Sequence, residues 1–263
     1  MKPLFADKVL KSAAVLWFLV AVAGQWLFVI YIAGFYSVPT LQGDFEAWNR
    51  NKMLVHGYVA GDTAGNLAFA AHVLMAAVIT FGATLQLIPQ IRARAISFHR
   101  WNGRLFIVTA FAISLAGLFL TWSRENIGLA SDLAISLNAV LIMFCAAQTF
   151  GFALARDIAT HRRWALRTFL LVNGVWFLRV GMMLWAILTQ GSETLNEPFF
   201  IFWTFGSYLL PLAVLELYFW TQERGGAAGK LAMAALLLVL TAGMGVGIFG
   251  ATMFMWRPLL IAG

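Results

Sequence analysis

The chain has 263 residues, of which 62% are hydrophobic and 11% are charged, and its formal net charge is +7. A soluble domain carries about 25% charged residues, so a chain of this size could not bury its apolar surface in water. The composition therefore excludes a soluble globular protein and indicates a protein of the lipid bilayer. The single cysteine, Cys145, rules out a disulfide within the chain and is expected to fill space in the interior.

Seven apolar stretches follow one another along the chain, and each is long enough to span a membrane. The segments between them carry the chemistry of loops. The first stretch is too long for the core of a signal peptide, so we expect it to remain as a span. We therefore expect an all-α, polytopic membrane protein that forms one seven-helix domain over residues 1–263. The expected spans are residues 10–35, 65–89, 101–122, 131–155, 164–189, 199–221 and 231–256.

The loop after the first span is the longest segment outside the expected membrane region. It contains the sequence DFEAWNR, residues 44–50. We expect this stretch to form a short interfacial helix, with Trp48 at the level of the lipid head groups, where tryptophan is enriched.

The cations predict an orientation in the membrane. If the N-terminus is cytoplasmic, thirteen Lys and Arg residues fall on the inner side and four on the outer side, and Arg179 is left within the fifth span. Cytoplasmic loops carry an excess of these residues. We therefore expect a cytoplasmic N-terminus, an external C-terminus and a location in a bacterial inner membrane. The basic inner face is expected to contact anionic lipids rather than nucleic acid.

Three polar side chains fall within three spans at similar expected depths. Counted at about 1.5 Å per residue from the outer ends, His72, Asn138 and Arg179 lie roughly 8 to 15 Å below the outer face. An arginine in hydrocarbon is costly, so Arg179 should face the bundle and find a partner. No carboxylate is expected at this depth. We therefore expect neutral partners, with His72, Asn138 or Asn173 nearest, and a polar pocket open to the outer side.

A second polar layer is expected near the inner ends of the spans. It consists of Gln86, Gln148, His99, Arg104, His161, Arg167 and Glu216. Glu216 is the only carboxylate that we expect to be buried within a span, and its natural partner is Arg104 or Arg167. Amides such as Gln86 and Asn138 also serve simply to hold membrane helices together.

A histidine–arginine motif occurs twice, as FHRWNGRLF from Phe98 and as THRRWALRTF from Thr160. In a four-helix bundle of spans two to five, the third and fifth spans would lie on a diagonal, so His99 and His161 would face each other. Two opposed imidazoles can hold the iron of a b-type haem while arginines bind its propionates. The arginines available are Arg100, Arg104, Arg162 and Arg167.

The same arrangement of histidines and arginines is also compatible with ligands other than haem. It could hold a transition metal, or bind a quinone or an anionic head group without a metal. The fourth span contains no histidine, and His72 has no clear partner at its depth. The sequence therefore allows at most one haem.

The polar residues of spans two to six carry a family resemblance. The segment AHVLMAAVITFGATLQLIPQIRARAISFHRWNGRLF, followed by HRRWALRTF, Arg179 and LELYF around Glu216, resembles a bacterial family of predicted membrane proteins, domain of unknown function 2306. The resemblance covers roughly residues 65–220, which we expect to form a five-helix core. It implies no reaction. The matching positions are His72, Gln86, His99, Arg100, Gly103, Arg104, His161, Arg162, Arg167, Arg179 and Glu216.

Three functions remain open from the sequence. The leading hypothesis is a redox or cofactor-binding membrane protein with His99 and His161 as ligands. Other membrane subunits or a quinone are candidate partners, and the sequence does not identify the electron partner. The second is a proton-coupled carrier with Arg179, His72 and Glu216 along a polar path. The third is an accessory subunit whose aromatic surfaces pack against a larger membrane complex.

Overall fold

The computed structural model describes residues 3–51, 57–124, 128–191 and 197–261, and every regular element within these ranges is a helix. The predicted all-α fold is therefore confirmed. The longer helices are α1 (Pro3–Ile32), α3 (Thr63–Leu87), α5 (Ile96–Ser123), α6 (Leu129–Leu154), α7 (Ile158–Val172), α8 (Gly174–Leu188), α9 (Glu197–Arg224) and α10 (Ala227–Gly250). The shorter ones are η1 (Ala33–Ser37), α2 (Val38–Gln42), η2 (Phe45–Arg50), α4 (Pro89–Arg94), η3 (Ala251–Trp256) and α11 (Arg257–Ile261).

Contacts between helices divide the chain into two compact units. Unit 1 comprises Met1–Leu27 and Val175–Met255, and unit 2 comprises Phe28–Gly174 and Trp256–Gly263. Unit 1 therefore contains most of α1 together with α8, α9 and α10. Unit 2 contains the helices from α2 to α7 and the C-terminal α11.

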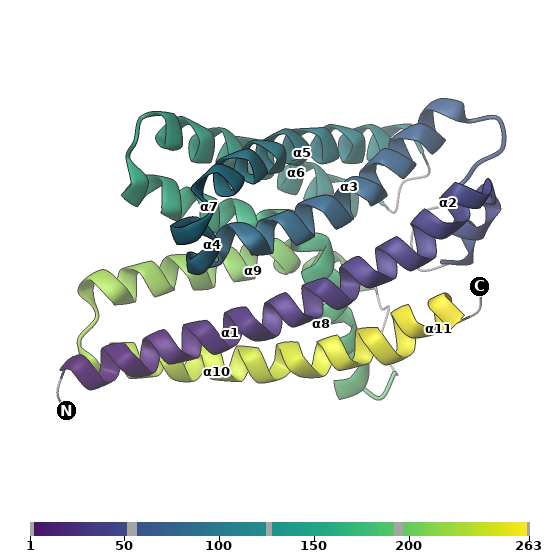
Figure 1. Cartoon of the computed structure of the whole chain (residues 1–263). Coiled ribbons are helices and arrows are strands. Elements are labelled where there is room, and N and C mark those ends of the chain that lie inside the picture. The colour runs from purple at the N-terminus through teal and green to yellow at the C-terminus, as the bar shows by residue number, and fades with distance from the viewer. Residues whose placement is uncertain (1–2, 52–56, 125–127, 192–196, 262–263) are drawn as a thin grey trace. The chain divides into compact units, whose positions relative to one another are not determined.

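Unit 2 is built around a four-helix bundle (Figure 1). α3 packs on α5, α5 on α6 and α6 on α7, and α7 in turn contacts α3. This closed order places α5 and α7 on a diagonal, as the sequence predicted for the third and fifth spans. The buried Cys145 lies within α6 and fills space in this unit, which confirms that prediction.

One end of this bundle is fixed by a polar cluster around Asp62. The Asp62 carboxylate caps α3 by accepting the Gly65 N–H at 2.8 Å, and it pairs with Arg124 Nε at 3.1 Å just beyond α5. Arg124 also donates to the Asn66 side chain at 2.7 Å. The bond from Gly65, with a smaller effect of Arg124, holds the pKa of Asp62 below its usual range. The cluster therefore ties the start of α3 to the end of α5.

The predicted short helix in the loop after α1 is present as the 3₁₀ helix η2, but its tryptophan lies inside the protein. Trp48 is 3% exposed. Its ring centroid lies 5.2 Å from that of Phe45 and 5.5 Å from that of Phe69 on α3. Trp48 is therefore an interior residue rather than the predicted interfacial anchor, because its indole packs against α3.

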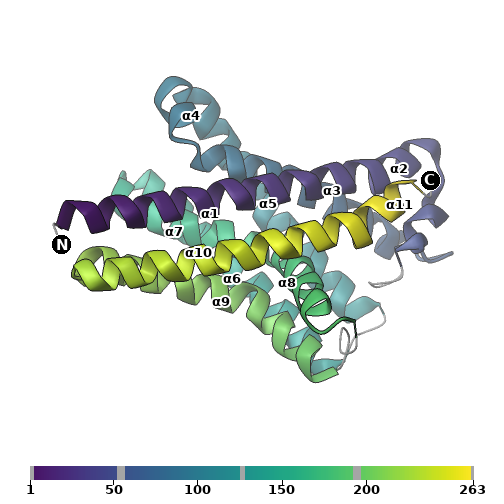
Figure 2. The same cartoon turned by 90° about the horizontal axis from the view of Figure 1, so that it is seen from below.

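In unit 1, α1 and α10 run side by side in the same direction (Figures 1 and 2). Lys230 at the start of α10 bonds to Asp7 near the start of α1 at 2.6 Å. Farther along, Leu10 joins an apolar cluster with residues of α10, and Gly24 lies against Ile248. Residue numbers therefore rise together along the two helices, which is the signature of a parallel pair.

α8 is packed against α9 and α10 through glycines. A Cβ added to Gly247 of α10 would lie 2.3 Å from the backbone oxygen of Val180, and one added to Gly181 would lie 2.0 Å from the ring of Trp203. The Trp203 indole N–H also donates to the Leu178 carbonyl at 3.0 Å. Only a residue without a side chain allows these helices to approach so closely.

Among the described residues, six helices are long and apolar enough to cross a membrane, and the bent pair α7 and α8 is a seventh candidate if it crosses as one span. This confirms a polytopic membrane protein. The expected span 164–189 is not one continuous helix, because α7 and α8 are bent by 54° at Asn173. The Asn173 side chain donates to the Phe169 carbonyl at 2.8 Å, a bond that the backbone N–H of an uninterrupted helix would make.

Candidate functional site

The two copies of the histidine–arginine motif open α5 and α7 and share one local geometry. The Arg104 guanidinium lies 5.0 Å from the ring centroid of Trp101, and that of Arg167 lies 4.6 Å from the ring centroid of Trp164. Residues three apart share a helix face, and a cation over an indole face is attracted by the ring. The tryptophan of each motif therefore positions the last arginine of the same motif.

The structure brings the predicted histidine pair to one end of the bundle in unit 2. The imidazole of His99 interacts electrostatically with that of His161, and also with Arg92 and Arg100. Arg100 and Arg162 are exposed and follow the two histidines directly in the chain. Two imidazoles and several cations therefore share this end of the diagonal between α5 and α7.

The ring of His161 is held in a defined orientation. Its Nδ1 lies 2.9 Å from the backbone oxygen of Thr149 on α6. A carbonyl oxygen only accepts, so Nδ1 carries a proton, and in the neutral ring Nε2 then keeps its lone pair. Histidines that ligate metals are typically oriented in this way. Nδ1 of His99 is buried and has no hydrogen-bond partner among the residues that the structure describes.

Two amide side chains join α3 to α5 beside His99. Gln86 Nε2 donates to the backbone oxygen of His99 at 2.9 Å, and Asn102 Nδ2 donates to that of Gly82 at 2.9 Å. A Cβ at Gly82 would already lie 3.0 Å from the Asn102 amide oxygen. These bonds fix the start of α5 against the end of α3, which confirms the helix-joining role expected of Gln86.

The histidine pair is not part of a larger cluster of metal ligands. Within the described ranges, no three or more His, Cys, Asp or Glu side chains lie close enough together to hold a metal ion. A structural zinc site takes about four such ligands, whereas haem iron takes one or two axial ligands from the protein.

His72 and Asn138 take different partners in unit 2. His72 Nδ1 lies 3.0 Å from the Ile113 carbonyl oxygen on α5, and a Cβ at Gly117 would lie 3.1 Å from the same ring. Asn138 Nδ2 donates to the Leu171 carbonyl on α7 at 3.4 Å. The first residue thus joins α3 to α5, and the second joins α6 to α7.

Arg179 is buried, as predicted, but it belongs to unit 1. It is 9% exposed and donates from Nη1 to the Val175 carbonyl oxygen at 3.2 Å within α8. One of its partners is therefore a neutral group. The three partners predicted for it, His72, Asn138 and Asn173, belong to unit 2.

Among the described residues, the buried carboxylate within a candidate span is Asp132, and the prediction that it is Glu216 is wrong. Asp132 in the first turn of α6 is 1% exposed, whereas Glu216 is exposed on α9. Val214 and Tyr218 of α9 pack against the apolar cluster of unit 1. At 3.6 residues per turn, Glu216 points about 200° away from each of them. Glu216 is exposed because of its rotation about the axis of α9, and its depth along that axis does not decide this.

Sequence reasoning missed several buried polar side chains. Gln25 of α1 is 0% exposed, and neither of its amide atoms has a hydrogen-bond partner within the described part of the chain. Ser114 Oγ, Asp132 Oδ2 and Trp176 Nε1 are likewise buried without a partner there. The available signal was a polar residue inside an apolar run, which in a membrane span is costly unless it has a role.

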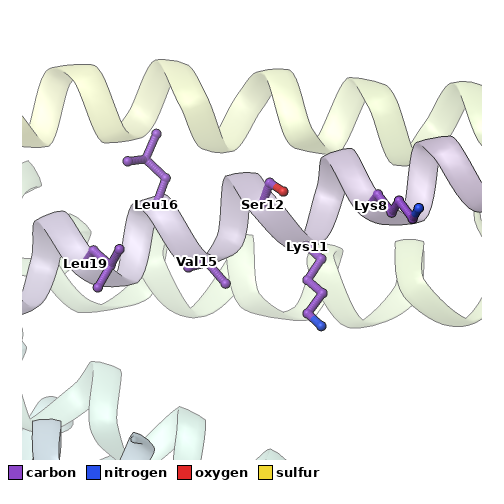
Figure 3. Close-up of a pocket in the computed structure, with 6 residues that line it drawn as sticks. All are labelled: Lys8, Lys11, Ser12, Val15, Leu16 and Leu19. Atoms are coloured by element: carbon purple, nitrogen blue, oxygen red, sulfur yellow. The ribbon is translucent and has the colours of Figure 1, made fainter.

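A groove along α1 does not have the form of a ligand site (Figure 3). It is lined by Lys8, Lys11, Ser12, Val15, Leu16 and Leu19, all from this one helix. Ligand sites are usually concave, with polar groups that converge from several elements. A single helix face does not supply that arrangement.

Comparison with known proteins supports the family resemblance. The model of a family described as predicted membrane protein (DUF2306) matches residues 69–219, which is more than half of the 263 residues. The matched segment contains both histidine–arginine motifs, His72, Arg179 and Glu216. Searches of the curated proteins and of the solved structures gave no match. The chain belongs to the DUF2306 family of predicted membrane proteins.

Proposed function

We propose that this membrane protein binds one b-type haem between His99 and His161 and acts in electron transfer. The observation that carries the proposal is the bond from His161 Nδ1 to the Thr149 carbonyl at 2.9 Å, which leaves Nε2 available to a ligand on the diagonal of the bundle. His99 stands on the other helix of this diagonal and interacts electrostatically with His161. A bound haem supplies one-electron chemistry at its iron.

The surrounding charges support a ligand with acidic groups. Arg100 and Arg162 are exposed beside the histidines, and within the described part of the chain neither stacks on a tryptophan as Arg104 and Arg167 do. Guanidinium groups bind carboxylates through paired hydrogen bonds. The role proposed for Arg100 and Arg162 is to hold the two propionates. α6 contains no histidine, so His72 has no counterpart on the helix diagonal to α3, which favours a single haem.

The other hypotheses are less well supported. A proton-coupled path through Arg179, His72 and Glu216 loses its buried acid, because Glu216 is exposed on α9. The same histidine–arginine end could take a quinone or a lipid head group without a metal. The absorption spectrum below separates these ligands from haem.

The proposed topology has seven spans, with a cytoplasmic N-terminus and an external C-terminus in a bacterial inner membrane. The parallel packing of α1 and α10 in unit 1 supports an odd number of membrane spans. If the pair α7 and α8 entered and left on one side, α10 would run antiparallel to α1. The ion pair between Asp7 and Lys230 joins the starts of both helices. The pair α7 and α8 therefore crosses as one bent span, and the excess of inner cations sets the orientation.

Single cysteines should report this topology in a Cys145→Ala background, in which the buried native thiol is removed. We expect cysteines at Arg94, Arg156 and Gln222 to react with an impermeant reagent only from the cytoplasmic side. Cysteines at Thr40 and Gln190 should react only from outside. Labelling at Gln190 from the cytoplasmic side would show that α7 and α8 form a re-entrant loop, and the seven-span topology would then be wrong.

The visible spectrum of the purified protein tests the proposed function directly. Protein from cells supplied with iron and a haem precursor should show a Soret band that shifts on reduction. Extraction with alkaline pyridine should then yield about one b-type haem per chain. A colourless preparation without extractable haem would contradict the proposal and leave the quinone or lipid alternatives.

A further inference from the structure

The break between α7 and α8 bends this candidate span by 54°. α7 ends at Val172, Asn173 follows it, and α8 begins at Gly174. Interrupted helices within membranes need new partners for their peptide groups. In transporters, such interruptions hold substrate ions, because the carbonyl end of a half-helix faces the ion. The side chains at this break therefore indicate what it could bind.

Two asparagine amides converge on the end of α7. Asn138 Nδ2 on α6 donates to the Leu171 carbonyl oxygen at 3.4 Å, and the backbone N–H of Asn173 donates to the same oxygen. Asn173 Nδ2 donates to the Phe169 carbonyl oxygen at 2.8 Å. Because each NH₂ group must face a carbonyl, the orientation of both amides is fixed.

This orientation leaves two acceptor atoms at the break. Oδ1 of Asn138 and Oδ1 of Asn173 are both buried and have no hydrogen-bond partner among the described residues. Asn173 as a whole is 1% exposed. A buried acceptor without a donor is costly. The missing partner must therefore be a hydrogen-bond donor or a cation.

We propose that the amide oxygens of Asn138 and Asn173 bind a monovalent cation, with Na⁺ as the expected ion. The C-terminal end of a helix carries a partial negative charge, which favours a cation over a neutral donor beside the end of α7. Asp132, also buried, lies six residues before Asn138 on α6, about 9 Å along the helix axis. Six residues are also about 240° of rotation, so Asp132 lies on another face of α6 from Asn138. The proposed ligands are therefore neutral amide oxygens, which suit a singly charged ion. The site is separate from the proposed haem ligand, since Asn173 follows His161 by twelve residues, about 18 Å along α7.

Thermal unfolding of the full-length protein in detergent tests this site. Unfolding would be followed in sodium, potassium and choline chloride at one ionic strength. We expect Na⁺ to raise the midpoint by about 2–6 °C over choline, and the rise to saturate with concentration, because the ion binds only the folded state. An equal rise in Na⁺ and K⁺ would still support a monovalent cation site. Equal midpoints in all three salts would overturn the proposal and leave a buried water.

Variants then assign the response to the two asparagines. Asn138→Ala should raise the Na⁺ concentration for the half-maximal effect by about tenfold or more, the loss expected for one ligand. Asn102→Ala is the matched control, because it removes an amide-to-carbonyl bond between α5 and α3 in the same unit. Its Na⁺ response should equal that of the unmodified protein. An equal loss of response in both variants would contradict the site.

Direct binding keeps the proposal testable if Asn138→Ala does not fold. The unmodified protein should retain about one radioactive sodium ion per chain in rapid filtration, and excess unlabelled Na⁺ should displace it, whereas choline should not. Retention no higher than that of a detergent blank would overturn the proposal. Because the absorption spectrum and this assay measure different ligands, either proposal can fail while the other stands.

Discussion

Replacing His161 by alanine is expected to remove the bound haem, so that the Soret band falls to background and extractable haem drops from about one per chain to near zero. The reason is that His161 supplies one of the two proposed axial ligands, and its ring is oriented for that role by the Thr149 carbonyl. His99→Ala should have the same effect. The measurement is the absorbance ratio and the extracted haem of protein collected from one monodisperse chromatographic peak.

His72→Ala is the matched control for this experiment. Like His161, His72 places Nδ1 against a backbone carbonyl of a neighbouring helix in unit 2, at 3.0 Å. Replacing His72 by alanine is therefore expected to lose about as much packing as replacing His161, but to leave the haem content unchanged. If all three alanine variants lost the chromophore together, the histidines would be structural. If none did, the haem would have other ligands.

The second large effect is expected from Gly247→Ala, which should destabilise the packing of α8 against α10 in unit 1. The new methyl group would lie 2.3 Å from the backbone oxygen of Val180, which cannot move away as a flexible side chain can. Overpacking of this kind costs about 1–3 kcal/mol. At about 2–4 °C per kcal/mol for a chain of this size, we expect the unfolding midpoint to fall by roughly 2–12 °C.

Gly245→Ala separates this clash from the general effect of glycine in a helix. No neighbouring atom lies within 4 Å of a Cβ added at Gly245. Alanine is favoured over glycine in a helix by about 0.5–1 kcal/mol, so this variant should unfold at the same temperature or slightly higher. A midpoint for Gly247→Ala equal to that for Gly245→Ala would show that α8 does not approach α10 so closely in the protein.

The membrane-spanning helices could be predicted from the sequence because their signal is long and additive. About 20 consecutive apolar residues give the same answer wherever the helix packs. The break at Asn173 was not predicted, because the run TFLLVNGVWFL stays apolar on both sides of it. An Asn-Gly pair is a turn signal, and here it marks the end of α7. Inside a long apolar run, the hydropathy outweighed this local cue.

The candidate site could be predicted only where the position of a residue along the chain was sufficient to place it. The position of His99 and His161 at the starts of two alternate spans predicted that they share one end of a diagonal, and contacts among the bundle helices agree. The choice between Asp132 and Glu216 as the buried acid depended on rotation about the helix axis. Depth along the chain carries no information on that angle when the whole helix is apolar.

The pairing of α1 with α10 has a consequence for how the protein is made. The ion pair between Asp7 and Lys230 joins residues that are 223 positions apart. At about 5–20 residues per second, a ribosome needs roughly 11–45 s to synthesise the partner of α1 after α1 itself has emerged. Through that interval the first helix must stay in the bilayer beside lipid or an insertion factor, while the helices of unit 2 can already associate. The helices of unit 1 can therefore assemble only after the bundle of α3, α5, α6 and α7 has been made, and a truncated chain that lacks α10 would leave the face of α1 that contains Gly24 open to degradation.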